Sequence, residues 1–234
     1  MKKDKHTCDL RSCFLCTHCL PEWSGAIATH RKNIVFKKGE ALFREGDPVA
    51  GIYFVNSGVV KVHKKWDQDK DLILRFAAAG DVLGHRGLGT DATYPISATA
   101  LAPTLLCYID LPFFEASLRT NYPFIHRLLH FLAEELQESE QRMRNLAHMQ
   151  VKGRVALALL ALRDKFGTTP EHAIGLTLSR QDLASFTGTT YETVFRIINE
   201  LVRDGLVSLT GKDIHILDSA GLSLLTKEEP VLFA

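Results

Sequence analysis

The chain has 234 residues, a formal net charge of +1 and 46% hydrophobic residues, which suits one large or two small domains with real cores. No run approaches the ~20 apolar residues of a membrane span. The start of the chain, MKKDKHTCDLRSC, lacks the apolar core of a signal peptide. These features exclude a membrane protein, and we expect a cytoplasmic one.

Four of the five cysteines lie close together near the start of the chain. Cys8, Cys13, Cys16 and Cys19 have the spacing C-x4-C-x2-C-x2-C, whereas Cys107 stands alone in an apolar stretch. In a reducing cytosol, such crowding indicates metal or redox chemistry more often than disulfides.

The next part of the chain carries strand signals punctuated by glycine. Short β-branched and aromatic runs recur at regular spacing, which is typical of an antiparallel barrel or roll. The runs are residues 34–36, 52–55, 59–62, 72–74 and 105–109.

A long helix is predicted from Pro123 to about His148, after a short one from Pro112 to Leu118. Apolar residues recur along the long helix at intervals of three and four, with charged residues between them, which indicates a coiled-coil seam between two copies of the chain. A core helix packed against its own sheet would show the same short repeat. The predicted seam residues are Leu129, Leu132, Leu136, Ser139, Met143 and Leu146.

A helix-turn-helix is predicted near the C-terminus, after an amphipathic helix over residues 152–166. Ser179 followed by Asp182 is a capping box that begins a first short helix, and Thr189 followed by Glu192 begins a second one. Two alternating runs then predict a tight β-hairpin, or wing. This order indicates double-stranded DNA as the partner, although a helical hairpin at the edge of any core shares the helix signals.

The second of these helices is predicted to bury one side and to present the other to base edges in a major groove. Arg196 suits O6 and N7 of guanine, and Glu192 suits the amino group of cytosine. The predicted buried side is Val194, Ile197, Ile198, Leu201 and Val202. The residues expected to contact DNA are Arg180, Thr189, Thr190, Tyr191, Glu192, Phe195, Arg196, Asn199 and Lys212.

The C-terminal part is not basic. From Gln150 onward the chain has nine lysines and arginines against ten acidic residues. A lone domain of this charge should bind DNA weakly, because phosphate contacts supply much of the affinity. We therefore expect a homodimer on a palindromic operator.

Taken in order, these segments resemble the CRP/FNR family of bacterial transcription regulators over roughly residues 30–225. Three stretches carry the resemblance: FKKGEALFREGDPVAGIYFVNSGVVKV, AAAGDVLGHRGL and LSRQDLASFTGTTYETVFRIINELVRDGLV. The resemblance implies a transcription regulator that is not an enzyme, with RNA polymerase as a further partner.

The fold class implied is α+β, with an N-terminal antiparallel β-roll like those that bind cyclic nucleotides, a long dimerisation helix and a C-terminal winged helix-turn-helix. The expected segments are a cysteine-rich segment (1–24), a sensory β-roll (25–122), the dimerisation helix (123–149) and the DNA-binding domain (150–234).

The DNA-reading helix of the family typically carries the pattern E-x-x-[SG]-R. Residues 192–196 fit this pattern except at Phe195. A bulky apolar side chain there would change the reading of one base and could pack on a thymine methyl. The usual half-sites of the family are therefore not assumed for this chain.

The β-roll also departs from the cyclic-nucleotide members of the family. Those members have Glu after the Gly of this segment and an Arg-Ser or Arg-Thr pair further on, whose Arg pairs with the phosphate. Here His85 and Arg86 follow Gly84, and the later stretch ends in Ser97. Because a buried phosphate needs a charge-assisted partner, cyclic AMP is not expected. We expect these four residues to line an effector pocket for another small anion, with plain surface charge as the alternative for His85 and Arg86.

The chain is more similar to the oxygen-sensing branch of the family. The resemblance to FNR-type sensors implies a 4Fe–4S cluster held by Cys13, Cys16, Cys19 and Cys107, with oxygen, redox state or nitric oxide as the signal. FNR-type sensors usually space their N-terminal ligands more widely on one side. A zinc ion on Cys8, Cys13, Cys16 and Cys19, or free thiols, therefore remain alternatives, with the β-roll then sensing a small anionic ligand. A thiol oxidoreductase is a remote alternative, because the C-x2-C pairs do not begin a βα unit.

Overall fold

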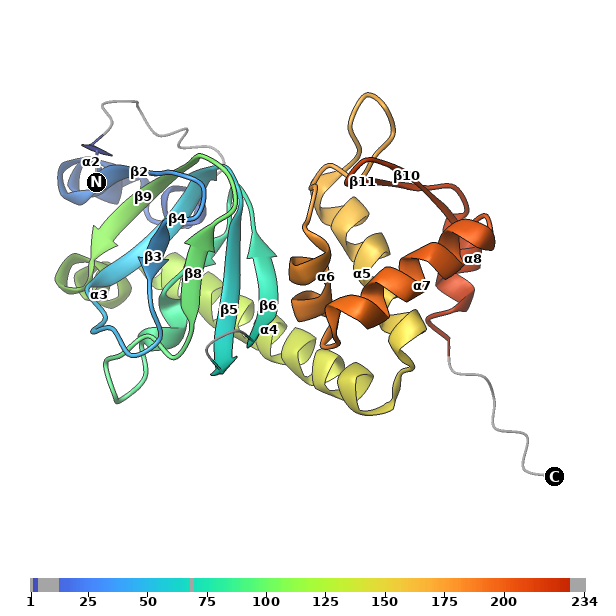
Figure 1. The fold of residues 1–234 in the computed structure, drawn as a ribbon. Coiled ribbons are helices and arrows are strands. Elements are labelled where there is room, and N and C mark those ends of the chain that lie inside the picture. Colours follow the sequence, from blue (N-terminus) through green and yellow to red (C-terminus); the bar gives the residue numbers. More distant parts are fainter. Residues whose placement is uncertain (1, 4–12, 68–69, 228–234) are drawn as a thin grey trace. The chain divides into compact units, whose positions relative to one another are not determined.

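The computed structural model describes residues 2–3, 13–67 and 70–227 (Figure 1). The chain forms two compact units, residues 1–136 and 137–234, and the boundary falls inside the long helix α4 (Tyr122–His148). The described cysteines Cys13, Cys16 and Cys19 belong to the first unit, and the long helix is shared between the two. The predicted α+β fold class is confirmed. Among the described residues, no helix combines the length and the apolar character needed to cross a bilayer.

Two antiparallel sheets build the β-roll of the first unit. One has the strand order β1-β2-β9-β4-β7 and the other the order β3-β8-β5-β6. The predicted strand runs fall within β2, β4, β5, β6 and β9, with Val59 lying just before β5. The strands are β1 (Lys2–Lys3), β2 (Lys32–Phe36), β3 (Ala41–Phe43), β4 (Gly51–Ser57), β5 (Val60–Asp67), β6 (Lys70–Ala77), β7 (Val82–Leu83), β8 (Ser97–Ala100) and β9 (Thr104–Asp110).

Strand β4 is buried on both faces, because successive side chains of a strand point to opposite sides of its sheet. Tyr53 and Val55 join the core between the two sheets. Ile52 and Phe54 join a second core on the other side of the five-stranded sheet, together with Cys107 of β9. A continuous apolar run in the sequence thus serves two separate cores.

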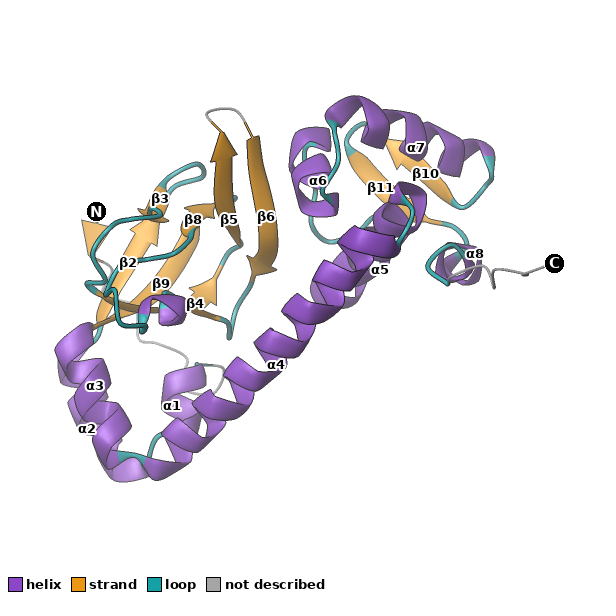
Figure 2. Ribbon diagram, turned by 90° about the horizontal axis from the view of Figure 1, so that it is seen from below, coloured by secondary structure: helices purple, strands orange, loops and turns teal. Residues whose placement is uncertain are grey.

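Helices cover the second core (Figure 2). Helix α3 begins at a cap, because the Asp110 carboxylate accepts a hydrogen bond from the backbone N–H of Phe113 at 3.0 Å. The predicted short helix is confirmed here, whereas α1 and α2 were not predicted. The helical elements of this unit are α1 (Phe14–His18), the 3-10 turn η1 (Pro21–Trp23), α2 (Ser24–His30), the 3-10 turn η2 (His85–Gly87), α3 (Leu111–Thr120) and the first half of α4.

The second unit is a three-helix core with a small hairpin. Helix α6 packs on α5 and α7, α8 packs on α5, and α7 also packs on β10. The predicted helix-turn-helix and wing are therefore present in the structure. The elements are α5 (Val151–Phe166), α6 (Arg180–Thr187), α7 (Tyr191–Arg203), β10 (Val207–Thr210), β11 (Asp213–Ile216) and α8 (Ser219–Leu224).

The turn between α6 and α7 corrects one sequence prediction. Gly188 has a positive φ of 65°, a conformation that suits glycine at a helix end. The N–H of Thr189 then donates to the carbonyl of Ala184 at 3.0 Å and so belongs to the end of α6. Thr190 caps α7 instead, since its hydroxyl accepts from the N–H of Thr193 at 3.3 Å. The predicted cap at Thr189 was therefore wrong by one residue.

Candidate functional site

Helix α7 is amphipathic in the predicted sense. Val194, Ile197, Ile198 and Leu201 are all buried. Val202, which was predicted to be buried, is 37% exposed, because it lies in the last turn of α7 at the edge of the apolar stripe. Over the first two turns of α7, the residues of the outward side are exposed to solvent.

Two aromatic side chains dominate this outward side. Tyr191 is 44% exposed and Phe195 is 52% exposed. Their rings are stacked, with centroids 6.3 Å apart and an interplanar angle of 15°. An exposed stacked pair of this kind is a large apolar surface on a helix that otherwise presents polar groups.

Each of the two predicted base-reading side chains directly follows one of the aromatic residues in the sequence. Hydrogen bonds from its own backbone N–H and from the hydroxyl of Thr190 lower the pKa of Glu192, so this exposed carboxylate is ionised at neutral pH. Arg196 Nη1 lies 2.7 Å from Oε1 of Glu200, one turn further along the helix. This ion pair lies at the surface, and the side chain of Arg196 is still mostly exposed.

A cleft of about 380 Å³ lies between α7, the start of α6 and the wing. Five of the nine predicted DNA contacts line it, namely Arg180, Tyr191, Phe195, Asn199 and Lys212. The other four, Thr189, Thr190, Glu192 and Arg196, are not among its lining residues. The cleft therefore combines cations with an aromatic wall.

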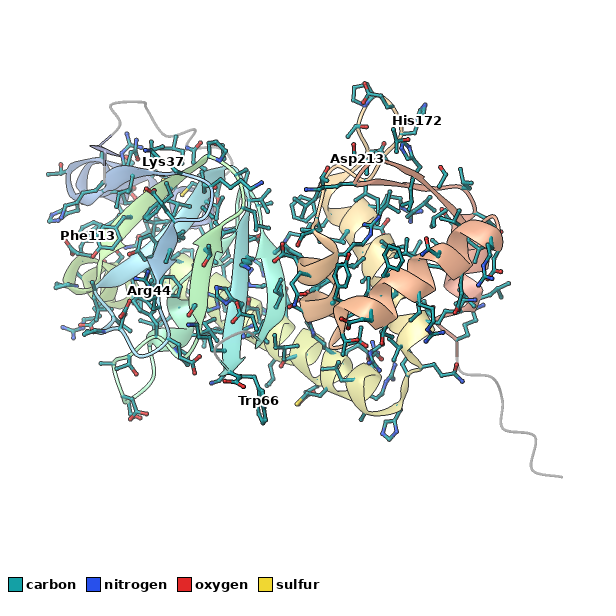
Figure 3. All side chains as sticks on the ribbon, viewed as in Figure 1. Lys37, Arg44, Trp66, Phe113, His172 and Asp213 are labelled. Carbon is teal, nitrogen blue, oxygen red and sulfur yellow. The ribbon has the colours of Figure 1, made fainter. Side chains whose placement is uncertain are left out.

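The start of α6 and the tip of the wing supply the polar side of this cleft. Ser179 caps α6 as predicted, since its hydroxyl accepts from the N–H of Asp182 at 2.9 Å. In the wing, Thr210 pairs with Asp213, which is labelled in Figure 3. Lys212 therefore lies in the two-residue turn between them. A helix N-terminus and a lysine are both groups that bind phosphate.

The cysteines form a second candidate site, in the first unit. Cys13 and Cys107 are 6% and 2% exposed, and both belong to the core between the five-stranded sheet and the helices. Cys16 and Cys19 are partly buried and pack against the same core. Two segments that are far apart in the sequence thus bring four thiols to one apolar cluster. Cys8, the fourth residue of the alternative zinc set, lies outside the described residues.

The residue type at this site fits an iron–sulfur cofactor, whereas the present arrangement of the side chains does not. Four cysteines around one apolar core are the donor type that 4Fe–4S clusters use. Burial raises the pKa of Cys19 to about 12, and nearby Cys13 adds to the shift. As the described side chains stand, however, no three His, Cys, Asp or Glu are placed to hold a metal ion.

The four residues of the expected effector pocket do not all contact one group. His85 and Arg86 both bind the carboxylate of Glu135 on α4, at 2.7 and 3.1 Å. Ser97 instead accepts the backbone N–H of Glu45 at 2.9 Å. His85 is buried, so the alternative of plain surface charge was wrong for it. Gly84 contributes a left-handed turn before η2.

Glu135 is the centre of a buried charged cluster that sequence reasoning missed. Besides His85 and Arg86, its carboxylate lies 3.1 Å from Nε of Arg75 on β6. Burial alone would raise the pKa of Glu135, but the hydrogen bond from His85 and the charges of both arginines lower it to about 2. Burial lowers the pKa of His85. No pattern in the sequence separates Glu135 from its exposed neighbour Glu134.

The predicted dimer seam is mostly exposed in the single chain. Leu129, Leu136 and Met143 are each about 60% exposed and Leu132 is 37% exposed. Ser139 is exposed too. Leu146 is half-buried, because it packs at the α6–α7 turn, where a Cβ on Gly188 would lie 2.6 Å from its Cδ2. An exposed apolar stripe along α4 suits a second helix of the same kind.

Comparison with known proteins agrees with this architecture. Residues 33–121 match the cyclic nucleotide-binding domain family, and residues 153–225 match the Crp-like helix-turn-helix domain family. The Transcriptional activator protein anr of Pseudomonas aeruginosa is 31% identical over 225 residues, which cover 92% of this chain and 91% of that protein. The CRP-like cAMP-activated global transcriptional regulator of Mycobacterium tuberculosis is 26% identical over 205 residues, covering 87% and 92%.

A solved structure shares the same fold. FixK2 from Bradyrhizobium japonicum superposes with a TM-score of 0.76 at 24% identity, covering 85% of this chain and 98% of that one. From the two domain matches and from the relative that aligns over nearly its whole length, the chain belongs to the CRP/FNR family of transcription regulators.

Proposed function

We propose that this regulator binds a palindromic operator as a homodimer, recruits RNA polymerase and responds to oxygen, redox state or nitric oxide through its cysteines. The observation that carries the signal is the gathering of Cys13, Cys16, Cys19 and Cys107 around one apolar core. A 4Fe–4S cluster on these residues would supply iron that reacts with oxygen or nitric oxide. We expect the active protein to be cytoplasmic.

The reading of DNA is assigned to the outward side of α7. Glu192 is an ionised acceptor, and Arg196 is a mostly exposed donor that pairs with Glu200 in the absence of DNA. Two such helices in a dimer fit successive major-groove faces about one helical turn apart. A dimer compensates for the weak charge of the single domain, because two copies make twice as many phosphate contacts as one.

Helix α4 links the cysteines to the dimer seam. The ring of Phe14, next to Cys13, contacts the rings of Phe124 and Phe131 on α4 at centroid distances of 6.0 and 5.4 Å. The same half of α4 carries the exposed seam residues Leu129 and Leu132. A change in the packing of the cysteine segment therefore shifts the face that a second copy must meet. Free energies of 1–3 kcal/mol are enough for such coupling.

A small anionic effector in the β-roll is the second candidate, favoured by the match to the cyclic nucleotide-binding domain family and by the relative named as cAMP-activated. In this chain, however, His85 and Arg86 are already bound to Glu135. A thiol oxidoreductase is less favoured, because the C-x2-C pairs do not begin a βα unit.

Single cysteine variants distinguish the proposed cluster from zinc. Protein purified without air should contain iron and sulfide, absorb near 400 nm and bind a palindromic duplex more tightly than after exposure to air. Cys107→Ser should lose the iron, whereas Cys8→Ser should keep it, because Cys107 belongs to the proposed ligand set and Cys8 does not.

The reverse result, zinc that survives in Cys107→Ser and is lost in Cys8→Ser, would select the zinc alternative. Metal-free wild-type protein that binds the duplex equally well in both atmospheres would contradict cysteine-based sensing altogether. Metal content is measured by elemental analysis and duplex affinity by titration at fixed salt.

A further inference from the structure

The aromatic pair on α7 leaves a large apolar area exposed. Tyr191 and Phe195 lie at the edge of the apolar face of α7, where the buried Ile198 lines the same cleft, and about half of each aromatic side chain is open to solvent. The two residues are one helical turn apart and their rings are stacked. Exposed apolar surface of this size costs free energy in water, so it favours a partner that covers it.

The surroundings of the pair specify the kind of partner. Both rings line the cleft whose other walls include Arg180 at the start of α6 and Lys212 in the wing. Burial lowers the pKa of the Arg180 guanidinium, and Tyr191 is close enough to offset part of this shift. An apolar patch bordered by cations suits a polyanion that also displays apolar groups, and does not suit a purely apolar peptide.

Duplex DNA displays one apolar group in its major groove, the 5-methyl group of thymine, and its other base edges carry hydrogen-bond donors and acceptors. We propose that Tyr191 and Phe195 read thymine methyl groups in the operator half-site, next to the bases read by Glu192 and Arg196. The ring centroids are 6.3 Å apart, and bases rise about 3.4 Å per step, so the pair spans thymines at neighbouring positions or one position apart. This inference rests on the proposed DNA-reading role of α7.

The specificity that follows is particular to this chain. Family members with Ser or Gly in place of Phe195 have no second ring, so they have no stacked pair to cover a methyl group. The operator of this protein should therefore require thymine at a position where those members have no such requirement.

The test replaces thymine by uracil, which removes the methyl group and keeps every hydrogen-bonding group of the base. A palindromic duplex is first selected with the wild-type protein from randomised DNA, and each thymine is then replaced in turn. One or two replacements should weaken wild-type binding about fourfold each, which is the contribution of one buried methyl group. In Phe195→Ser, one of these penalties should disappear, and in Tyr191→Ala, the other.

Val202→Ser is the matched control, because Val202 is an exposed apolar residue of the same helix that does not line the cleft. This variant should keep both uracil penalties, and unchanged thermal unfolding of all three variants confirms that they fold. Specific binding of the selected duplex with no uracil penalty at any position would overturn the inference and leave the proposed DNA-reading role intact. Failure to select any duplex would overturn both.

Discussion

Replacing Leu136 by glutamate is expected to convert the dimer into a monomer. Leu136 lies in the middle of the exposed stripe of α4 with Leu132 and Met143 on either side. Each of these side chains contributes about 1.5–3 kcal/mol when it is fully covered, and both copies of the chain contribute. A carboxylate in the centre of that seam would lose this contribution and leave a charge without a partner. Sedimentation should show a halved mass and operator affinity should fall at least tenfold.

Gln137→Glu is the matched control for this change. It adds the same negative charge at the next residue of α4, which is exposed and lies beside the predicted seam. This variant should remain a dimer and bind the operator normally. An unchanged mass for Leu136→Glu would show that the exposed stripe is not the dimer interface.

Replacing Glu135 by glutamine is expected to destabilise the first unit by about 3–5 kcal/mol, because removing one partner of a buried ion pair leaves the other charges uncompensated. Here Arg75 and Arg86 would both lose the carboxylate that they share. Glu134→Gln is the control, since Glu134 is exposed and its pair with Arg127 at 3.1 Å lies at the surface. That control should change the free energy of unfolding by less than about 1 kcal/mol. Urea unfolding measures both, and equal effects would contradict a buried cluster.

The same cluster predicts how stability depends on pH. The pKa of Glu135 is lowered to about 2, so its contribution is complete above its ordinary pKa and is lost as pH falls towards 2. Burial lowers the pKa of His85, so the unfolded chain takes up this proton more readily than the folded chain below about pH 6.5. Both groups therefore destabilise the wild-type protein on acidification. The part of this loss that comes from Glu135, between about pH 4.5 and pH 2, should be absent in Glu135→Gln.

The helix-turn-helix was readable from the sequence because its signals are local. Ser179 caps α6 as predicted, and the apolar spacing of Val194, Ile198 and Leu201 gives the buried side of α7. The cap of α7 is Thr190 and not Thr189. Gly188 takes a left-handed conformation, and the N–H of Thr189 therefore donates to the end of α6. Local patterns therefore predict elements well and their first residues less well.

The charged cluster around Glu135 and the two cores on either face of the five-stranded sheet could not be predicted from the sequence, because they depend on contacts between distant segments. The sequence around Glu135 is that of an exposed position in a coiled coil. Arg75 and His85 reach Glu135 only in the folded chain. The placement of Cys107 on the helix side of β9 likewise follows from strand register. The resemblance to oxygen sensors implied that Cys107 joins the N-terminal cysteines, and the structure places all of the described ones at the same core.

The outward side of α7 is proposed to read base edges, and the base discrimination of Arg196→Ala is the sharpest test of this role. Binding is measured at fixed salt to the selected operator and to variants with each base pair exchanged. The wild type should discriminate at one guanine position of each half-site by about 1–3 kcal/mol, and Arg196→Ala should lose that discrimination while keeping the others. Arg203→Ala, which removes the same charge from the exposed last turn of α7, should keep every base preference. Undiminished discrimination at every position in Arg196→Ala would contradict the account.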